Sequence, residues 1–386
     1  MEERSCLSRK NTTQVICDMH INHLDDQSLS ALLGRGVVPV QSAKARAILH
    51  RKIILVTGAA GSIGSELCRQ LLSYQPEQVI ALDTNETGLF DLAESVRAHT
   101  QDTRLRIQIG DIRDVQSISR LMGKVQPHII FHAAAYKHVP LLEDHPDQAT
   151  QTNVVATYHL CRLAQSYGVE QFVFISTDKA ADPESILGAS KRVGELMIQA
   201  FAKLEHSGTR FCAVRFGNVL GSRGSVVPVF ARQIARGGPV TVTDPDATRY
   251  FMTIPEACGL VILTTTLVGQ GGLYLLDMGE PVKIVDLAMK MICTQGRQVG
   301  QDIAITYTGL RPGERLHEML VASDEVLLPT SQSKIFCVTS QERTPVPATI
   351  AQWIQTFEEV LAYGNHEQLR EHLFEIVQKQ AHVSVF

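Results

Sequence analysis

Short apolar runs alternate along the chain with longer segments whose apolar residues recur at helical spacing. The first such pair begins at residue 52, where the apolar run KIILVTG ends in glycine and the helical pattern SELCRQLLSY follows. Further apolar runs of strand length lie at residues 78–83, 105–109, 128–132, 171–175 and 210–215. Helical patterns fill the intervals between them, including residues 114–124, 147–167 and 188–205. This alternation predicts an α/β protein with a doubly wound parallel sheet, whose ligands bind at the carboxyl ends of the strands.

The alternation loosens after about residue 216, which predicts a second, smaller unit. GNVLGSRGSVVPVF is typical of a loop that leads into a helix, whereas a helix at 255–268 and the strand GLYLLDM are expected to return to the main sheet. Two more helices are expected at 348–362 and 365–378. A smaller C-terminal lobe that closes over the strand ends is the simplest architecture.

The chain therefore divides into three predicted units. Residues 1–50 are polar and irregular, with a short helical pattern at 24–34, and are expected to form a partly disordered N-terminal extension. Residues 51–215 are expected to form the sheet domain, with returning elements at 250–278, and residues 216–386 mainly a substrate-binding lobe.

Composition and charge narrow the classes of function. The chain has 386 residues, 44% of them hydrophobic and 20% charged, and a formal net charge of −4 without a long basic run, so nucleic acid is not expected as a partner. The eight cysteines form no CxxC pair, which argues against a metal site or disulfide framework and favours a reducing compartment. The longest apolar run, GLVILTTTLV, is too short to span a bilayer, and the N-terminus lacks an apolar signal core. A soluble cytoplasmic protein is expected.

The segment TGAAGSIGSE, residues 57–66, places Gly58, Gly61 and Gly64 between a strand and a helix, with Ser62 and Ile63 in the same turn. This is the spacing G-x-x-G-x-x-G. It allows a tight turn, a close approach of the backbone to a pyrophosphate and a helix N-terminus that faces it. Three glycines can also serve only tight packing, but the position between strand and helix favours a Rossmann-like dinucleotide site.

Other strand ends supply the remaining cofactor contacts. Asp83 ends the second strand, where a carboxylate accepts both ribose hydroxyls of adenosine and repels a 2′-phosphate, so NAD is favoured over NADP. The alternative is a solvated aspartate in a turn. Asp111 and Ile112 in GDIRD and Ala133 and Ala134 in HAAAY also follow strands and are expected to line the adenine and central ribose or pyrophosphate.

With these motifs, the chain resembles the extended short-chain dehydrogenase/reductase superfamily. Within it, the chain is most similar to the nucleotide-sugar 4,6-dehydratases of bacterial capsule, flagellin and glycan biosynthesis. The resemblance covers roughly residues 28–380 and rests on LLGRGVVPV, VTGAAGSIGSELCRQL, AAAYKHVPLLE, STDKA, GASKR, RFGNVLGSRGSVVPVF, TRYFMTI and GLRPGERLHE. Many members carry membrane helices and a further domain ahead of the catalytic part, so this chain resembles a soluble short form.

The resemblance implies NAD-dependent 4,6-dehydration of a UDP-N-acetylhexosamine, first of all UDP-N-acetylglucosamine, by a lyase that recycles its NAD and forms a homo-oligomer. C4 is oxidised, water leaves across C5–C6, and hydride returns to C6. By resemblance, Thr177 hydrogen-bonds the C4 oxygen, Asp178 is the acid at C6 and Lys179 is the base at C5. Lys191 contacts the nicotinamide ribose and holds positive charge near the C4 hydroxyl. A buried lysine serves as a base because desolvation lowers its pKa, which an adjacent carboxylate opposes.

Position 187 departs from the resemblance. The branch of the family that inverts C5 usually keeps tyrosine there and the retaining branch methionine, whereas this chain has Leu187, close to methionine in size and polarity. Retention at C5 is therefore expected. Thr177, Asp178, or a relay through water or the ribose stays open as the acceptor of the C4 hydroxyl proton.

Substrate contacts are expected after the strand ends and in the lobe. Lys137 and His138 follow the fourth strand and are expected to face the sugar or a phosphate, although His138 is equally consistent with a loop histidine bonded to backbone. By resemblance, Asn218 holds the nucleotide sugar, Arg249 and Arg311 clamp the diphosphate, and Glu314 accepts the uridine ribose hydroxyls or pairs with Arg315.

Three alternatives remain open. A 4-epimerase needs no acid–base pair beyond C4, so Asp178 and Lys179 argue against it. A 5,6-dehydratase would use the same pair. A catalytically silent NAD-binding sensor is supported only by Leu187 and opposed by Asp178, Lys179 and Lys191.

Overall fold

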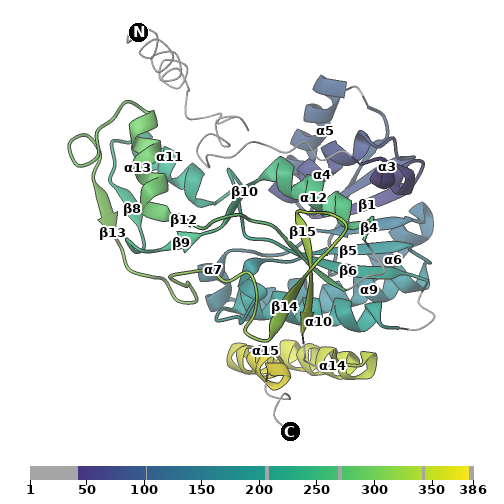
Figure 1. The fold of residues 1–386 in the computed structure, drawn as a ribbon. Helices are drawn as coiled ribbons and strands as arrows, with labels where there is room; N and C mark the ends of the chain where they lie inside the picture. Colours follow the sequence, from purple (N-terminus) through teal and green to yellow (C-terminus); the bar gives the residue numbers. More distant parts are fainter. Residues whose placement is uncertain (1–41, 101, 205–207, 268–271, 341–343, 382–386) are drawn as a thin grey trace.

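The computed structural model describes residues 42–100, 102–204, 208–267, 272–340 and 344–381 (Figure 1). A nine-stranded sheet forms its centre, in the order β14-β15-β11-β6-β5-β4-β1-β2-β3. Its strands are β1 (Ile53–Thr57), β2 (Gln78–Asp83), β3 (Leu105–Ile109), β4 (Ile129–His132), β5 (Gln171–Ile175), β6 (Arg210–Arg215), β11 (Leu273–Leu276), β14 (Glu325–Pro329) and β15 (Ile335–Ser340). The strands from β3 to β11 pair in parallel, which confirms the predicted doubly wound sheet, and β15 and β14 add an antiparallel edge.

The strand order reverses at β1, because β2 pairs on one side of it and β4 on the other. Parallel sheets open a crevice at such a point, beyond the carboxyl ends of the strands. Each of these central strands is buried on both faces, which explains why they appear in the sequence as continuous apolar runs.

Helices cover both faces of the sheet and create two apolar cores. Leu55 of β1 points to one core and its neighbours Ile54 and Val56 to the other, as the two-residue period of a strand requires. The first core is closed by α6 (Val115–Val125), α9 (Ala156–Ser166), α10 (Ile186–Ala202), α14 (Pro347–Tyr363) and α15 (His366–Ala381). The second is closed by α3 (Ala43–Leu49), α4 (Ser62–Leu72), α5 (Glu86–Thr100) and α12 (Ile254–Thr264).

One predicted helix contains an irregular turn. The pattern at 147–167 forms α8 (Pro146–Ala149), a π-helical turn η2 (Thr150–Val155) and then α9. Such turns widen a helix by one residue and are frequent at functional sites. Here the turn carries Thr152 and Asn153 toward the strand ends, and Asn153 is tied to Tyr136 by two hydrogen bonds.

The lobe begins directly after β6 and has a core of its own. That core is formed by residues of α11 (Val226–Ala235), β8 (Val240–Val242), α13 (Ile284–Thr294) and β13 (Ile305–Tyr307), among others. Three separate two-stranded pairs lie within this part of the chain: β7 (Asn218–Leu220) with β10 (Phe251–Thr253), β9 (Thr248–Arg249) with β12 (Val282–Lys283), and β8 with β13. Figure 1 shows the lobe to one side of the main sheet, with α14 and α15 packed beneath α10.

The returning helix and strand predicted at 255–268 and in GLYLLDM are present as α12 and β11, which pairs with β6. The helical pattern at 24–34 lies outside the described residues. Within the predicted extension, α3 buries Ala45 and Leu49 in the second core. Within residues 216–386, the last two strands and the last two helices belong to the sheet domain rather than to the lobe's core. The exact domain boundaries stay a prediction.

None of the described helices has the length and apolarity needed to cross a bilayer.

Candidate active site

The glycine-rich turn between β1 and α4 depends on the absence of side chains. Gly58 has a φ of +69°, and a Cβ there would lie 2.5 Å from the backbone nitrogen of Ala134. A Cβ on Gly64 would lie 2.1 Å from the carbonyl oxygen of Gly58. The turn therefore requires glycine at both positions, the first for backbone conformation and strand contact and the second for the approach of α4.

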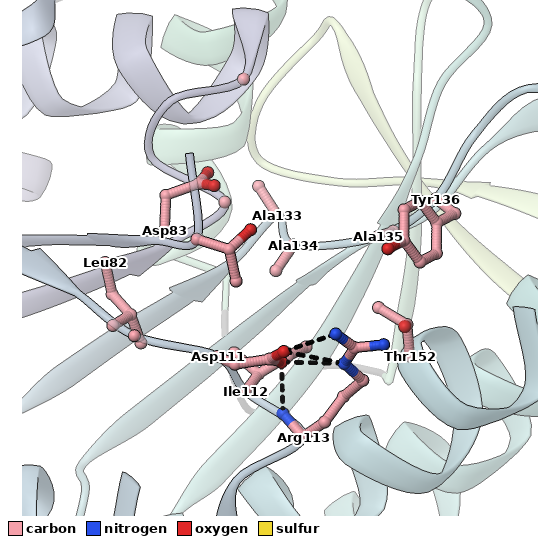
Figure 2. A pocket seen from close by; sticks show the side chains of 14 residues that line it. Leu82, Asp83, Asp111, Ile112, Arg113, Ala133, Ala134, Ala135, Tyr136 and Thr152 are labelled. Carbon is pink, nitrogen blue, oxygen red and sulfur yellow. Dashed lines mark hydrogen bonds and ion pairs between the residues drawn. The ribbon is translucent and has the colours of Figure 1, made fainter. Parts of the chain in front are cut away.

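A pocket of about 230 Å³ lies at the carboxyl ends of β1 to β4, at the point where the strand order reverses (Figure 2). Its lining residues are Gly58, Gly61, Leu82, Asp83, Thr84, Gly110, Asp111, Ile112, Arg113, Ala133, Ala134, Ala135, Tyr136 and Thr152. The predicted cofactor residues Gly58, Gly61, Asp83, Asp111, Ile112, Ala133 and Ala134 are thus brought together. Ser62, Ile63, Gly64 and Lys191 are not among the lining residues.

The Asp83 carboxylate is held against the glycine-rich turn. Its Oδ2 accepts a hydrogen bond from the backbone nitrogen of Ala60 at 2.9 Å, and its Oδ1 accepts one from the backbone nitrogen of Asn85 at 2.9 Å. Each oxygen keeps a further lone pair for a ligand. The carboxylate is therefore fixed in place and able to accept two hydroxyl groups.

Two features of this pocket were missed by the sequence prediction. Arg113 forms an ion pair with Asp111 at 2.6 Å, visible in Figure 2, and its hydrogen bonds hold the pKa of Asp111 below the ordinary value. Thr152, on the π-helical turn, buries its Oγ1 without a hydrogen-bond partner among the described residues. No pattern in the sequence signals a π-helical turn, whereas the basic residue two positions after Asp111 was visible.

These residues fit a dinucleotide. The glycine turn leaves a cradle that a Cβ would fill, Asp83 offers acceptors for a ribose diol, and Thr152 offers an unused hydroxyl. Arg223, in the loop after β7, connects the lobe to the glycine-rich turn. Its backbone nitrogen donates to Ser62 Oγ at 3.1 Å and its guanidinium donates to the carbonyl oxygen of Ala60 at 3.1 Å.

A second group of polar residues lies at the carboxyl end of β5. Thr177 caps the short turn η3 (Asp178–Ala180), and its hydroxyl donates to Asp178 Oδ1 at 2.8 Å. Lys179 Nζ donates to the same oxygen at 3.0 Å. The side chain of Asp178 is 1% exposed, and its other oxygen, Oδ2, has no hydrogen-bond partner among the described residues.

Lys179 lies between two carboxylates rather than beside one. Its Nζ is 3.1 Å from Glu318 Oε1, which comes from the loop after β13 and was not predicted as a site residue. Burial disfavours the charged amine, but Asp178 and Glu318 together outweigh it, so the pKa of Lys179 lies above its ordinary value. Burial lowers this pKa and Asp178 opposes it, as expected from the sequence, but the expectation lacked the second carboxylate, Glu318, with which the net shift is upward.

Helix α10 packs closely against this turn. A Cβ on Gly188 would lie 2.2 Å from the carbonyl oxygen of Lys179, so the glycine of GASKR permits the contact. Lys191 is buried, donates to the carbonyl oxygen of Ile175 at 2.9 Å and lies 4.4 Å from the centre of the Phe174 ring. Burial lowers the pKa of Lys191 to about 7, against a smaller opposing effect of Glu195. Leu187, one turn earlier, is 4% exposed and belongs to the first core.

The predicted substrate residues lie on four segments: the loop after β4, strand β7, strand β9 and the loop after β13. Arg249 donates to the carbonyl oxygens of Thr248 and Leu316 and to Glu314 Oε1, so its guanidinium is largely engaged within the protein. Glu314 does not pair with Arg315 as the alternative supposed. Arg315 instead pairs with Glu184 at 2.9 Å.

The remaining predicted contacts are less constrained. Asn218 donates from its backbone and its side chain to the carbonyl oxygen of Tyr250, at 3.0 and 3.4 Å. Lys137, His138 and Arg311 are exposed. The ring of His138 lies beside Gly224, where a Cβ would approach it to 2.6 Å. The roles of all these residues toward a substrate stay predictions.

Comparisons with known proteins place these features in context. The polysaccharide biosynthesis protein family matches residues 54–340. The probable polysaccharide biosynthesis protein EpsC of Bacillus subtilis is 45% identical over 302 residues, 78% of this chain and 50% of that protein. The chain therefore spans about half the length of this curated relative.

Two further relatives carry more specific names. The UDP-N-acetylglucosamine 4,6-dehydratase (inverting) of Campylobacter jejuni is 31% identical, over 72% of this chain and 80% of that protein. The UDP-glucose 4-epimerase of Rickettsia rickettsii is 33% identical, over 71% of this chain and 79% of that protein. At this level of identity, a dehydratase and an epimerase are similarly close to the chain.

Solved structures share the fold. Pen from Bacillus thuringiensis superposes with a TM-score of 0.68 at 31% identity and covers 78% of this chain and 89% of that one. The dTDP-glucose 4,6-dehydratase DesIV from Streptomyces venezuelae, with NAD and DAU bound, has a TM-score of 0.60 at 27% identity and covers 69% and 87%.

Proposed function

The chain belongs to the polysaccharide biosynthesis protein family, on the fold of the short-chain dehydrogenases/reductases, and from this membership we propose that it is a nucleotide-sugar enzyme that uses NAD. More specifically, we propose that it converts a UDP-N-acetylhexosamine, first of all UDP-N-acetylglucosamine, into the UDP-4-keto-6-deoxy sugar with release of water. A homo-oligomer and a cytoplasmic location stay predictions.

The fit of the pocket to a dinucleotide supports the choice of cofactor. Gly58, Gly61 and Asp83 would hold the pyrophosphate and the adenosine ribose, and the Asp83 carboxylate would repel a 2′-phosphate. When bound, NAD supplies the hydride acceptor for oxidation at C4 and the hydride donor for C6. Lys191 would orient the nicotinamide ribose.

One observation carries the dehydration chemistry: the buried Asp178 and the partly buried Lys179 form an acid–base pair, with Nζ 3.0 Å from Oδ1, at the carboxyl end of β5. A dehydratase must remove a proton from C5 and give one to the C6 hydroxyl as it leaves, and a 4-epimerase needs neither. The two groups are hydrogen-bonded to each other, and Asp178 is shielded from water while Lys179 is 20% exposed, so a proton can pass between them at a defined position.

The ion pair becomes reactive through one internal proton transfer. If the proton on Lys179 Nζ moves to Asp178 across their hydrogen bond, the N–H bond breaks, the O–H bond forms, and the pair holds a neutral amine and a neutral carboxylic acid. The amine then takes the C5 proton and the acid protonates the departing C6 hydroxyl. Thr177 would hold the C4 oxygen through its hydroxyl.

The environment of Leu187 supports retention at C5. Its side chain is packed in the apolar core, where methionine would fit with little change in volume. Because Leu187 carries no proton, the acceptor for the C4 hydroxyl proton must be another group: Thr177, whose hydroxyl donates to Asp178, Asp178 itself, or a relay through water or the ribose.

A 4-epimerase is the second candidate, favoured by the similarity to the Rickettsia enzyme. It would use Lys191 and NAD but leave Asp178 and Lys179 without a chemical task. The buried, unpartnered Oδ2 of Asp178 argues for the dehydratase.

The test is product analysis. The purified chain is incubated separately with UDP-N-acetylglucosamine and UDP-glucose, and the products are followed by proton NMR. A 4-keto-6-deoxy product with unchanged C5 configuration supports the proposal. An equilibrium mixture of C4 epimers would identify an epimerase, an unsaturated 5,6-product a 5,6-dehydratase, and NAD binding without turnover of either sugar would contradict an enzymatic role.

A further inference from the structure

Glu318 is the least explained charged residue near the proposed acid–base pair. It lies in the loop between β13 and β14, its side chain is 3% exposed, and no sequence motif assigned it a role. A carboxylate this deeply buried is rare unless it is paired with a cation. Its partners therefore indicate its task.

Glu318 contacts two cations from different parts of the fold. Its Oε1 is 3.1 Å from Lys179 Nζ, on the turn after β5, and 3.5 Å from Arg249 Nε, on β9 of the lobe. Arg249 in turn pairs with Glu314 at 3.0 Å. The carboxylate thus connects the acid–base pair of the sheet domain to an arginine of the lobe.

The contact also restricts Lys179. A lysine side chain has four rotatable bonds and reaches many positions, but two carboxylates on different elements define one. Asp178 approaches from the lysine's own turn and Glu318 from the opposite loop. The ammonium group is therefore held at the oxygen to which its proton would be transferred.

We propose that Glu318 is a positioning residue for the proposed dehydration: it holds Lys179 Nζ beside Asp178 and couples this pair to Arg249. The proposal rests on the proposed function. Glu318 acts through Lys179 and does not itself touch the reacting atoms.

The charge of Glu318 has a predictable effect on proton affinity. The charged groups around Lys179 are Asp178 on its own turn and Glu318 on the facing loop, with Arg249 and Glu314 behind Glu318. Because negative neighbours favour the ammonium form, removing one of them lowers the pKa of Lys179, by about one to three units for a contact of this kind. The active pair keeps one proton, shared between Asp178 and Lys179, so activity falls as pH rises through the pKa of Lys179, and lowering that pKa moves the fall toward neutral pH.

The first measurement compares wild type, Glu318→Gln and Glu184→Gln by the pH dependence of kcat/KM. Glu184 is an exposed carboxylate that pairs with Arg315 near the site and serves as the matched control. We expect the descending limb of Glu318→Gln to lie about one to three pH units below that of the other two proteins. Unchanged limbs in all three, or an equal shift in Glu184→Gln, would overturn the proposal.

The second measurement does not need turnover. Protein labelled with ¹³C at lysine Cε is titrated by NMR, and the Lys179 signal is assigned by its loss in Lys179→Arg. We expect the signal to titrate at lower pH in Glu318→Gln than in wild type. If it does so while no UDP sugar is converted, the proposed function fails and the positioning role stands. If its titration is unchanged, the positioning role fails.

Glu318→Asp covers the case in which the glutamine variant does not fold. Aspartate keeps the charge on a shorter side chain, so the Lys179 signal should titrate near the wild-type pH while kcat falls. A kcat equal to that of wild type would show that the reach of Glu318 does not matter and would contradict a positioning role.

Discussion

Two groups of buried or partly buried charges contact the same short segment, residues 176–179, and they differ in how completely they are paired. Ser176 donates to Glu195 Oε1 at 2.7 Å, whereas its near neighbour Lys179 pairs with Asp178 and Glu318. We call the first group the core network; it consists of Arg192, Glu195, Arg215 and Glu325. We call the second the site cluster; it consists of Asp178, Lys179, Arg249, Glu314 and Glu318.

The core network is balanced and closed. Its two arginines match its two glutamates, no side chain in it is more than 6% exposed, and all four carboxylate oxygens accept hydrogen bonds. It ties α10 to β6 and β14. Such a network is satisfied internally, which leaves no group available for a ligand.

The site cluster is neither balanced nor closed. It has two cations and three carboxylates, a formal charge of −1, and Asp178 Oδ2 has no partner within the described residues. An excess of buried charge with an unpaired oxygen destabilises a protein unless a ligand or a reaction uses it. The comparison teaches that incomplete pairing, rather than burial of charge, marks the candidate active site.

The largest effect that tests this difference is on catalysis. Lys179→Ala removes the proposed base, so we expect turnover of UDP-N-acetylglucosamine to fall by about 10²- to 10⁴-fold, the usual contribution of general acid–base catalysis. NAD binding should persist, because Lys179 does not line the dinucleotide pocket. Turnover is measured by NMR and NAD binding by the cofactor that copurifies. Full activity in this variant would remove Lys179 from the mechanism.

The next largest effect is on stability. Arg215→Ala leaves Glu195 and Glu325 buried without their main cation, and we expect the free energy of unfolding to fall by about 3–5 kcal/mol. Denaturant unfolding measures it. Arg97→Ala is the control, since the Arg97–Glu94 pair is exposed and should contribute at most about 1 kcal/mol. Equal losses in the two variants would mean that the core network does not stabilise the fold.

The contrast also explains what the sequence could predict. The central strands are buried on both faces, so each appears as an apolar run, and β2, β3, β5 and β6 have the predicted bounds. The edge strand β14 was missed because it is half-exposed, with Val326 at 52%, and ends in proline. Its signal is neither an apolar run nor a regular alternation.

The site follows the same division. Residues at strand ends, such as Asp83 and Asp178, are visible because their position follows from the strand before them. Glu318 was missed because only the folded loop brings it to Lys179. Without Glu318, the upward shift of the pKa of Lys179 could not be predicted. The core network was missed for the same reason, since its members come from three separate elements.

The smallest effect concerns Lys191, which lies on α10 one turn before Glu195 and donates to the carbonyl oxygen of Ile175. Burial lowers its pKa from 10.5 to about 7 in the folded protein. Between these values the unfolded chain binds a proton that the folded chain does not, so the free energy of unfolding should rise with pH, by about 1 kcal/mol per pH unit. Lys191→Met should lack this rise, whereas Lys203→Met, which removes an exposed lysine at the end of the same helix, should keep it. Unfolding by denaturant at several pH values between about 7 and about 9.5 separates the three proteins within this titration window. Identical slopes in wild type and Lys191→Met would mean that Lys191 stays charged in the folded protein. Glu195 of the core network would then stabilise the charge of Lys191, and the two groups would not be electrostatically separate.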